Sequence, residues 1–282
     1  MRETNGWFRL LTMFGALAMV AAACSNNPET PAPGGGGGTG ATGATGQMEM
    51  QPGAENMHVK FVSPDPGFVL TGNTLKFKVK TSGYTDACDT AGKPVAEGEG
   101  HYHILLDGAL INMFCTATGS VSMQNVAPGD HMLEAVPAQN DHAEVHDNAV
   151  ELPFTYKPSN PLPEITEPVT GTPTIQILEP QDGATLSGDF DVMVRITNYD
   201  DDCSLLGKPD VPGHGHWHVN IDSMSGPMMG MGTMLGMACT NTFHGSTVGL
   251  DAGSTHTLFA LLTDDGHAPI DVFDQIDFTV GS

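Results

Sequence analysis

The chain has few basic residues and few aromatic ones. Lysine and arginine together number 10 against 33 aspartates and glutamates, which gives a formal net charge of −23 at pH 7, and only 6% of the 282 residues are aromatic. A surface this acidic repels nucleic acids and anionic membranes, so we expect no nucleic-acid partner. The same charge favours cations around the protein, although acidity also serves simply to keep a secreted protein soluble.

Sustained helical periodicity and the common catalytic motifs are also missing. No segment after residue 23 repeats its apolar residues at a helical period, and none is long and apolar enough to span a bilayer. The sequence contains no Gly-x-Ser-x-Gly and no phosphate-binding Gly-rich loop between a strand and a helix. It also has no carboxylate pair retained in both halves. We therefore expect a protein that is not an enzyme.

What the chain does have is an internal repeat. Residues 84–107 align without a gap on residues 199–222, and 11 of these 24 positions are identical. Further on, the segment 131–143 matches the segment 256–268. A repeat of this size indicates tandem domains rather than a short-period solenoid. Both copies keep four histidines, two cysteines, one aspartate and a Gly-Lys-Pro.

The N-terminus is typical of a bacterial secretion signal. Arg2 and Arg9 flank its start, and the uncharged, mostly apolar run of residues 10–23 is too short to span a bilayer comfortably. We expect this signal peptide to cover residues 1–23.

The residues around Cys24 carry a family resemblance. Ala21-Ala22-Ala23-Cys24 resembles the lipobox of bacterial lipoproteins, although Ala21 stands where Leu is commoner. The resemblance implies lipidation of Cys24 and membrane attachment through it; the alternative is ordinary cleavage near Ala23 with Cys24 a free thiol. Ser25, in place of Asp, implies retention at the outer membrane, on its periplasmic or its surface face.

Composition divides the rest of the chain into two connecting segments and two domains. Residues 24–56 are rich in Gly, Pro, Thr and Ala and predict a disordered tether. Residues 157–173 hold five prolines and predict a stiffer, extended linker. The segments 57–156 and 174–282 are each large enough for a single core.

Both domains are predicted to be all-β. Alternating apolar residues and β-branched or aromatic runs predict six strands in each. In the first domain they lie near 58–63, 74–81, 101–107, 120–126, 131–137 and 149–156. In the second they lie near 174–179, 189–197, 216–222, 246–250, 256–263 and 275–280. Six or seven short strands per domain indicate two tandem immunoglobulin-like β-sandwiches.

Two motifs add family resemblances. Ser63-Pro64-Asp65-Pro66-Gly67 and Glu179-Pro180-Gln181-Asp182-Gly183, each followed by Leu-x-Gly, resemble the start of bacterial Ig-like domains. The repeated Gly-His-x-His-x-x-x-Asp segment resembles a family of short secreted bacterial domains with no assigned activity. Both resemblances imply a fold and leave the function open.

The remaining cysteines number two per domain. In an oxidising compartment this predicts one disulfide in each, Cys88–Cys115 and Cys203–Cys239. A competing interpretation makes Cys239 and His244 ligands of a blue-copper-like site. It fails in the first copy, where no histidine follows within residues 116–120.

The histidines are the candidate functional residues. Alternation along a strand puts His101 and His103 on one face, with Asp107, and the core-forming aromatic and aliphatic residues on the other. The second copy repeats this with His216, His218 and Asp222. We therefore expect each imidazole pair on the wetter face of its sheet, with the two residues about 6–7 Å apart.

Antiparallel pairing predicts which other histidines join them. Since the start of one strand meets the end of its neighbour, His142 is expected beside His101 and His103, and His267 beside His216 and His218. His131 and His256 are expected to form structural hydrogen bonds with Asp107 and Asp222. Three imidazoles suit Zn(II) or Cu(II) with an open fourth position.

A methionine-rich insertion in the second copy favours copper over zinc. Thioether sulfur prefers Cu(I), and the candidate ligands are Met224, Met228, Met229, Met231, Met234 and Met237. The alternative is a flexible apolar loop that uses Met as an adaptable contact surface. The acidic clusters 200–202 and 264–265 match no calcium motif and are interpreted as turns.

The sequence thus predicts a lipid-anchored cell-envelope binding module for copper or zinc. Its main alternative is a structural or adhesive surface lipoprotein whose histidines are fold elements and whose protein or glycan partner is unknown. A remote alternative is an enzyme similar to copper–zinc superoxide dismutase, which is also an Ig-like sandwich with His-x-His on a strand and one disulfide. The chain lacks that family's long zinc loop with its clustered ligands.

Overall fold

In the part of the chain that the structure describes, the regular secondary structure is almost entirely β-strand. The computed structural model describes residues 50–225 and 232–282, and Ala44–Ser282 belong to one compact unit. Within the described residues, every helix is a single 3-10 turn of three residues. None of them is long or apolar enough to cross a bilayer. The predicted signal peptide, Cys24 and most of the predicted tether lie outside the described residues.

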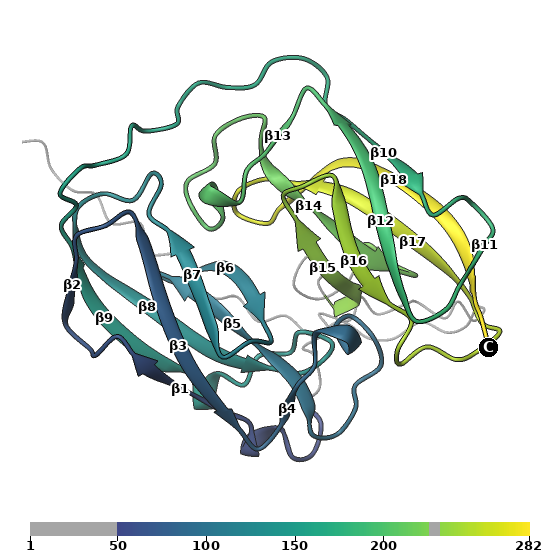
Figure 1. Ribbon diagram of the computed structural model, residues 1–282, viewed down its shortest axis with the longest axis horizontal. Coiled ribbons are helices and arrows are strands. Elements are labelled where there is room, and N and C mark those ends of the chain that lie inside the picture. The colour runs from purple at the N-terminus through teal and green to yellow at the C-terminus, as the bar shows by residue number, and fades with distance from the viewer. Residues whose placement is uncertain (1–49, 226–231) are drawn as a thin grey trace, which may run out of the picture. The chain divides into compact units, whose positions relative to one another are not determined.

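The first domain contains nine strands and three 3-10 turns in its described residues (Figure 1). The strands are β1 (His58–Ser63), β2 (Phe68–Leu70), β3 (Thr74–Ser82), β4 (Thr85–Asp86), β5 (Glu99–Leu106), β6 (Ala109–Phe114), β7 (Thr118–Ser122), β8 (Gly129–Ala138) and β9 (Val150–Tyr156). The turns are η1 (Ala54–Asn56), η2 (Cys88–Thr90) and η3 (His146–Asn148).

The second domain repeats this order of elements. Its strands are β10 (Thr174–Glu179), β11 (Ala184–Leu186), β12 (Asp189–Thr197), β13 (Asp200–Asp201), β14 (His214–Ile221), β15 (Met234–Ala238), β16 (Thr242–Ser246), β17 (Thr255–Thr263) and β18 (Pro269–Val280). The 3-10 turn η4 (Cys203–Leu205) lies between β13 and β14.

Each domain is a sandwich of a small and a large sheet. The small sheets have the order β1-β3-β7 and β10-β12-β16, and the large sheets have the order β2-β9-β8-β5-β4 and β11-β18-β17-β14-β13. β6 and β15 pair with β5 and β14 at the edge of the large sheets. In the first domain, the sheet of β1, β3 and β7 therefore packs against the sheet of β2, β9, β8, β5 and β6. This is the connectivity of an Ig-like sandwich. The predicted all-β fold with two tandem sandwich domains is confirmed.

The core of each sandwich follows the period of two that the sequence shows. On β3, Leu75, Phe77 and Val79 are buried and the residues between them are exposed. On β5, Tyr102 and Ile104 belong to the same apolar cluster and are fully buried. Trp217 and Val219 take the equivalent places on β14 and are also fully buried.

Both predicted disulfides are present. Cys88 in η2 is bonded to Cys115 just after β6, with their Cα atoms 5.7 Å apart. Cys203 in η4 is bonded to Cys239 just after β15, with a Cα separation of 5.4 Å. Each bond ties the segment before the central strand to its edge partner, and two such bonds are typical of an extracytoplasmic protein.

The proline-rich segment between the domains is fastened to both of them. The side chains of Gln124 and Asn125 hydrogen-bond to its Pro163 and Ile165 carbonyls in the first domain. On the other side, its Glu167 carbonyl accepts from His214 Nε2, and Val169 N–H donates to the Pro212 carbonyl. The segment is therefore an extended strap with fixed contacts rather than a free spacer.

Candidate metal centres

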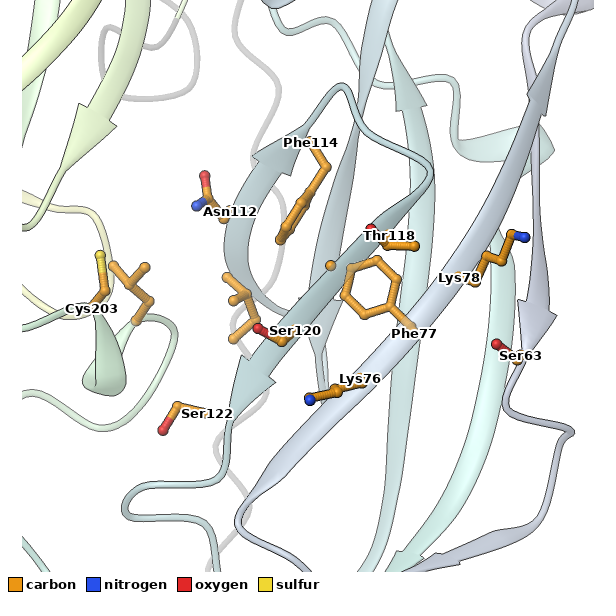
Figure 2. Close-up of a pocket in the computed structure, with 13 residues that line it drawn as sticks. Ser63, Lys76, Phe77, Lys78, Asn112, Phe114, Thr118, Ser120, Ser122 and Cys203 are labelled. Atoms are coloured by element: carbon orange, nitrogen blue, oxygen red, sulfur yellow. The ribbon is translucent and has the colours of Figure 1, made fainter.

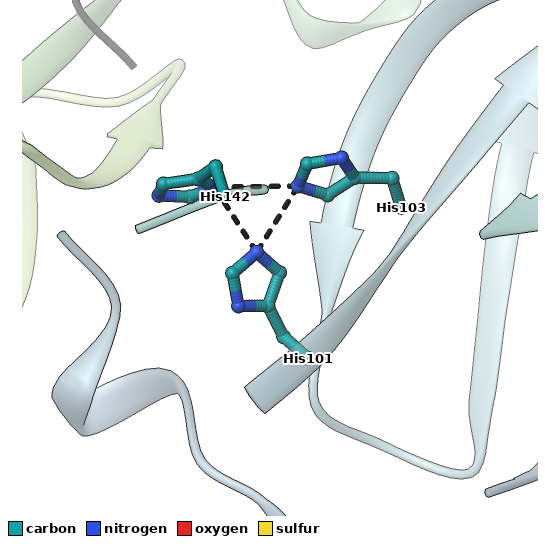
Figure 3. Close-up of side chains that lie close together, drawn as sticks. All are labelled: His101, His103 and His142. Carbon is teal, nitrogen blue, oxygen red and sulfur yellow. Dashed lines mark hydrogen bonds between the residues drawn. The ribbon is translucent and has the colours of Figure 1, made fainter. Parts of the chain in front are cut away.

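The first domain brings His101, His103 and His142 together. His101 and His103 stand on β5, and His142 stands in the turn after β8, which pairs with β5 so that His101 faces Ala138. His101 Nε2 lies 3.0 Å from His103 Nε2 and 3.0 Å from His142 Nδ1, and the latter two atoms are 3.2 Å apart. Figure 3 shows the three rings pointing at one another.

The second domain builds the same cluster from equivalent residues. His216 Nε2 lies 2.8 Å from His218 Nε2 and 3.0 Å from His267 Nδ1, and the remaining side of the triangle is 3.4 Å. His216 and His218 stand on β14, and His267 stands in the turn after β17. We call the two clusters trio 1 (His101, His103, His142) and trio 2 (His216, His218, His267).

The prediction that these histidines lie on a solvent-exposed face of the sheet is wrong. Every trio residue is buried, with His218 the most exposed at 4%. In the first domain the chain after β8 folds back on itself through a Gln139 N–H to Ala143 O bond, and Gln139, Asn140 and Ala143 are buried with His142. This turn carries no alternating pattern, so its packing over the sheet was not predictable from the sequence.

Hydrogen bonds on the outer side of two rings fix which nitrogens point inward. His142 Nε2 donates to the Met234 carbonyl (2.8 Å), so its Nδ1 presents a lone pair to trio 1. His103 Nδ1 donates to Glu144 Oε1 (2.5 Å), so its Nε2 does the same. Two lone pairs 3.2 Å apart therefore face each other, and only His101 can place a proton between them. A cation at this point satisfies all three nitrogens at once.

Unpartnered atoms support the same conclusion. Among the described residues, the buried Nδ1 atoms of His101 and His216 have no hydrogen-bond partner. A proton on His101 Nε2 leaves its Nδ1 a bare acceptor, and a proton on Nδ1 leaves a bare donor and three converging lone pairs. Buried polar groups are rarely left unpaired without a functional reason.

Burial disfavours the charged form of five of the six trio histidines. It lowers the pKa of His101 and of His216 well below the usual value, and charges on their trio neighbours add to this. Burial likewise lowers the pKa of His142 to about 3 and that of His267 to about 4. It also lowers the pKa of His218 well below the usual value. Metal ligation needs neutral imidazole, and the lowered pKa values of these five rings favour that form.

The nitrogen triangles have the right size for a transition-metal ion. The three nitrogens of each trio lie 2.8–3.4 Å apart, close enough to hold one ion at the usual N–metal distance of about 2.0–2.1 Å. Such an ion would accept a further ligand beside the three imidazoles. Because every donor is nitrogen, the set suits copper or zinc and is unsuited to Ca²⁺ or Mg²⁺, which prefer oxygen.

The third histidine of each trio occupies a strained backbone conformation. His142 and His267 have φ angles of 64° and 68°, in the left-handed region that favours glycine. Gly266 stands directly before His267 and does not take the left-handed position. Non-glycine residues there cost about 1–3 kcal/mol and cluster at functional sites. The strain is what aims Nδ1 of each ring at its trio.

The other two repeated histidines make the bonds expected of them. His131 Nδ1 lies 2.7 Å from Asp107 Oδ2, and His256 Nδ1 lies 2.7 Å from Asp222 Oδ2. The second oxygen of each aspartate accepts a backbone N–H from the neighbouring strand, Met132 in one case and Thr257 in the other. These pairs connect strands and lie apart from the trios.

The methionine segment is only partly a loop. Met228, Met229 and Met231 lie outside the described residues, and Met224 lies in a bend after β14. Met234 and Met237 stand on strand β15, where Met234 is 3% exposed and Met237 packs against the first domain's core. Because β15 pairs with β14, these two methionines lie in a sheet rather than in the expected loop.

The acidic clusters are turns only in part: Asp200 and Asp201 form the short strand β13, whereas Asp202 and Asp264 stabilise turns through their carboxylates. Asp202 Oδ1 accepts the Ser204 N–H, and Asp264 Oδ1 accepts the N–H groups of Gly266 and Ala268. His244, the other half of the rejected blue-copper interpretation, is exposed and bonded to Asp191, while Cys239 is in a disulfide.

Sequence reasoning missed Glu144. Its carboxylate bonds His103 on one side and lies 3.2 Å from the exposed His146 on the other. Burial raises the pKa of Glu144, but the His103 hydrogen bond and neighbouring charges outweigh this and hold the pKa below its usual value. The signal was available as His142-Ala-Glu144, but the second copy has Pro269 at the equivalent position, so the repeat did not point to it.

The structure also contains a pocket away from the trios. It has a volume of about 700 Å³, and Figure 2 shows Phe77 and Phe114 in its wall with Lys76 and Lys78 along the rim. Its lining contains no cluster of histidines or carboxylates, so it offers no chemistry comparable to that of the trios.

Comparison with known proteins leaves the family open. No protein-family model and no curated protein matches the chain. Similar solved structures include fibronectin(III)-like modules of CbhA from Clostridium thermocellum (15% identity, 79% of this chain, 94% of that chain, TM-score 0.26). They also include CopC from Methylosinus trichosporium OB3b (16%, 37%, 99%, 0.22) and the chicken CNTN1 FN1–FN3 domains (8%, 78%, 66%, 0.22). Likeness at this level says nothing about what this chain binds.

Proposed function

We propose that this chain is an extracytoplasmic metal-binding protein whose two trios each hold one transition-metal ion. The observation that carries the proposal is the convergence of three imidazole nitrogens about 3 Å apart in each domain, with outer hydrogen bonds that turn lone pairs inward. A structural role alone would be served better by rings that satisfy one another. No catalytic role is proposed for the trios.

Copper is the favoured metal and zinc the second. A neutral all-nitrogen donor set follows the general order of affinities in which Cu(II) binds most tightly among the divalent first-row ions. Zinc accepts the same three ligands and an open position. The net charge of −23 offsets the positive charge that two dications add to the protein.

Metal analysis of the signal-free protein tests this function. Wild type should bind two Cu(II) ions per chain in calorimetry. His101→Ala should bind one, and His101→Ala with His216→Ala should bind none. The matched control is His131→Ala with His256→Ala, which also removes two repeated histidines but leaves the trios intact and should keep two ions. Equal uptake by wild type and the trio double variant, or no uptake by either, would favour a structural or adhesive surface protein.

We further propose that the protein is attached to the outer membrane through lipidated Cys24. The lipobox-like Ala21-Ala22-Ala23-Cys24 and the disulfides support an envelope location. Radiolabelled palmitate should be incorporated into the wild type in a bacterial host and not into Cys24→Ser. Labelling of both proteins, or of neither, would contradict attachment at this residue.

A further inference from the structure

The Gly-Lys-Pro segments retained in both copies lie where the two domains meet. Gly92 packs against Met234 on β15 of the second domain: a Cβ on Gly92 would lie 2.5 Å from the Met234 carbonyl oxygen. Gly207 packs in the same way against Leu110 on β6 of the first domain, with the corresponding distance again 2.5 Å. Both glycines have left-handed φ angles. Each domain thus presents the same loop to the same edge strand of the other, as in a twofold symmetric dimer.

The two carbonyls that contact these glycines also accept a hydrogen bond from the third histidine of each trio. The Met234 carbonyl accepts from His142 Nε2 at 2.8 Å, and the Leu110 carbonyl accepts from His267 Nε2 at 3.0 Å. The third ligand of each trio is therefore oriented by the other domain. Partners of this kind, which fix the ring and tautomer of a ligating histidine, strongly affect metal affinity.

The two glycines also donate hydrogen bonds to the turns that carry these histidines. Gly92 N–H donates to the Asn140 carbonyl, two residues before His142. Gly207 N–H donates to the Asp265 carbonyl, two residues before His267. In each domain one glycine thus contacts both the histidine's own turn and the carbonyl across the interface that bonds its ring.

The lysine of the first segment fastens the same interface. Lys93 is 4% exposed, and its Nζ donates to the Ser246 and Val248 carbonyls of the second domain, each at 2.6 Å. Leu206, beside Gly207, is part of the first domain's apolar core.

We propose that metal binding at the trios and docking of the two domains are coupled, each domain completing the other's metal site through one strand carbonyl. The proposal rests on the proposed function. Coupling between two equilibria is reciprocal. A bound ion therefore adds as much free energy to the docking of the domains as docking adds to the binding of the ion. Gly-Lys-Pro is then retained for the same reason as the histidines.

Substitutions at the two glycines test the coupling in the full signal-free chain with Cu(II) as the probe. Gly92→Ala with Gly207→Ala should weaken Cu(II) binding roughly tenfold in competition with a chromophoric chelator. The matched control is Gly98→Ala with Gly188→Ala, because these glycines have similar φ angles, 75° and 66°, and nothing within 4 Å of the added methyl group. Equal affinity in the two double variants would overturn the coupling.

A second variant and a reciprocal measurement avoid dependence on one backbone change. Lys93→Met removes the bonds to Ser246 and Val248 without touching a ligand or its turn, and should weaken Cu(II) binding about fivefold. In hydrogen exchange, Cu(II) should slow the amides of 108–114 and 232–238 in wild type and not in His101→Ala with His216→Ala. Unchanged affinity in Lys93→Met, or unchanged exchange in wild type, would contradict the coupling. A wild type that takes up no ion would instead contradict the proposed function itself.

Discussion

Acid should destabilise the metal-free protein through its buried trios. The folded-state pKa of His142 is about 3 and that of His267 about 4, against 6.5 for an ordinary histidine. A depressed pKa means that the unfolded chain binds more protons than the folded one below pH 6.5. The associated stability is therefore complete above pH 6.5 and is lost as the pH falls toward 3–4.

The size of the effect follows from the two pKa values. At pH 5, each imidazole that stays neutral in the folded protein lowers the free energy of unfolding by about 2 kcal/mol relative to neutral pH. The two together lower it by about 4 kcal/mol. That is a large share of the 5–15 kcal/mol by which domains are usually stable. The lowered pKa values of the buried His101, His216 and His218 also reduce the free energy of unfolding as the pH falls.

Replacement of His142 and His267 by Asn isolates this contribution. Asn tolerates left-handed φ angles and does not titrate. Urea unfolding with a chelator present, followed by circular dichroism at pH 7.5 and 5, should show the variant losing about 4 kcal/mol less than wild type. His131→Asn with His256→Asn serves as the control and should lose stability as the wild type does. Equal losses in wild type and the trio variant would refute the reasoning.

Two further predictions concern the loaded protein. Glu144→Gln should weaken Cu(II) binding at trio 1 about tenfold, measured in a His216→Ala background, because the negative charge that hydrogen-bonds to His103 is lost. The control Glu151→Gln, at an exposed glutamate, should have no effect. Unchanged Cu(II) affinity in Glu144→Gln would show that Glu144 does not support the site. Cu(II) at a hundred times its dissociation constant should stabilise each occupied site by about 2.7 kcal/mol and raise the melting temperature, and an unchanged melting temperature in calorimetry would contradict binding to the folded state.

The sequence was sufficient for the fold and for the grouping of the histidines. Alternation identifies β5 and β14, and antiparallel pairing with β8 and β17 brings the end of one strand to the start of the other. That geometry alone places His142 beside His101. Strands with long, regular alternation, such as β3 and β12, were also predictable within a residue or two.

Short edge strands and irregular turns were not predictable. β6 and β15 carry Met, Asn and Gly in place of a clear alternation, and β4 and β13 have two residues each. The burial of the trios depends on turns whose sequence shows no period. The contact of Gly92 with Met234 joins residues of different domains, and nothing local in either segment encodes it.

The two trios have identical donor atoms, Nε2, Nε2 and Nδ1, so any difference in their metal preference must come from the residues behind them. Trio 1 has Glu144 behind His103, where the second domain has Pro269. A carboxylate partner makes the imidazole a stronger donor, which favours the dication. Trio 2 lacks this carboxylate and lies on the strand that pairs with methionine-bearing β15. If the sites differ, trio 1 is therefore the tighter site for Cu(II) and Zn(II), and trio 2 is the one to release its ion first.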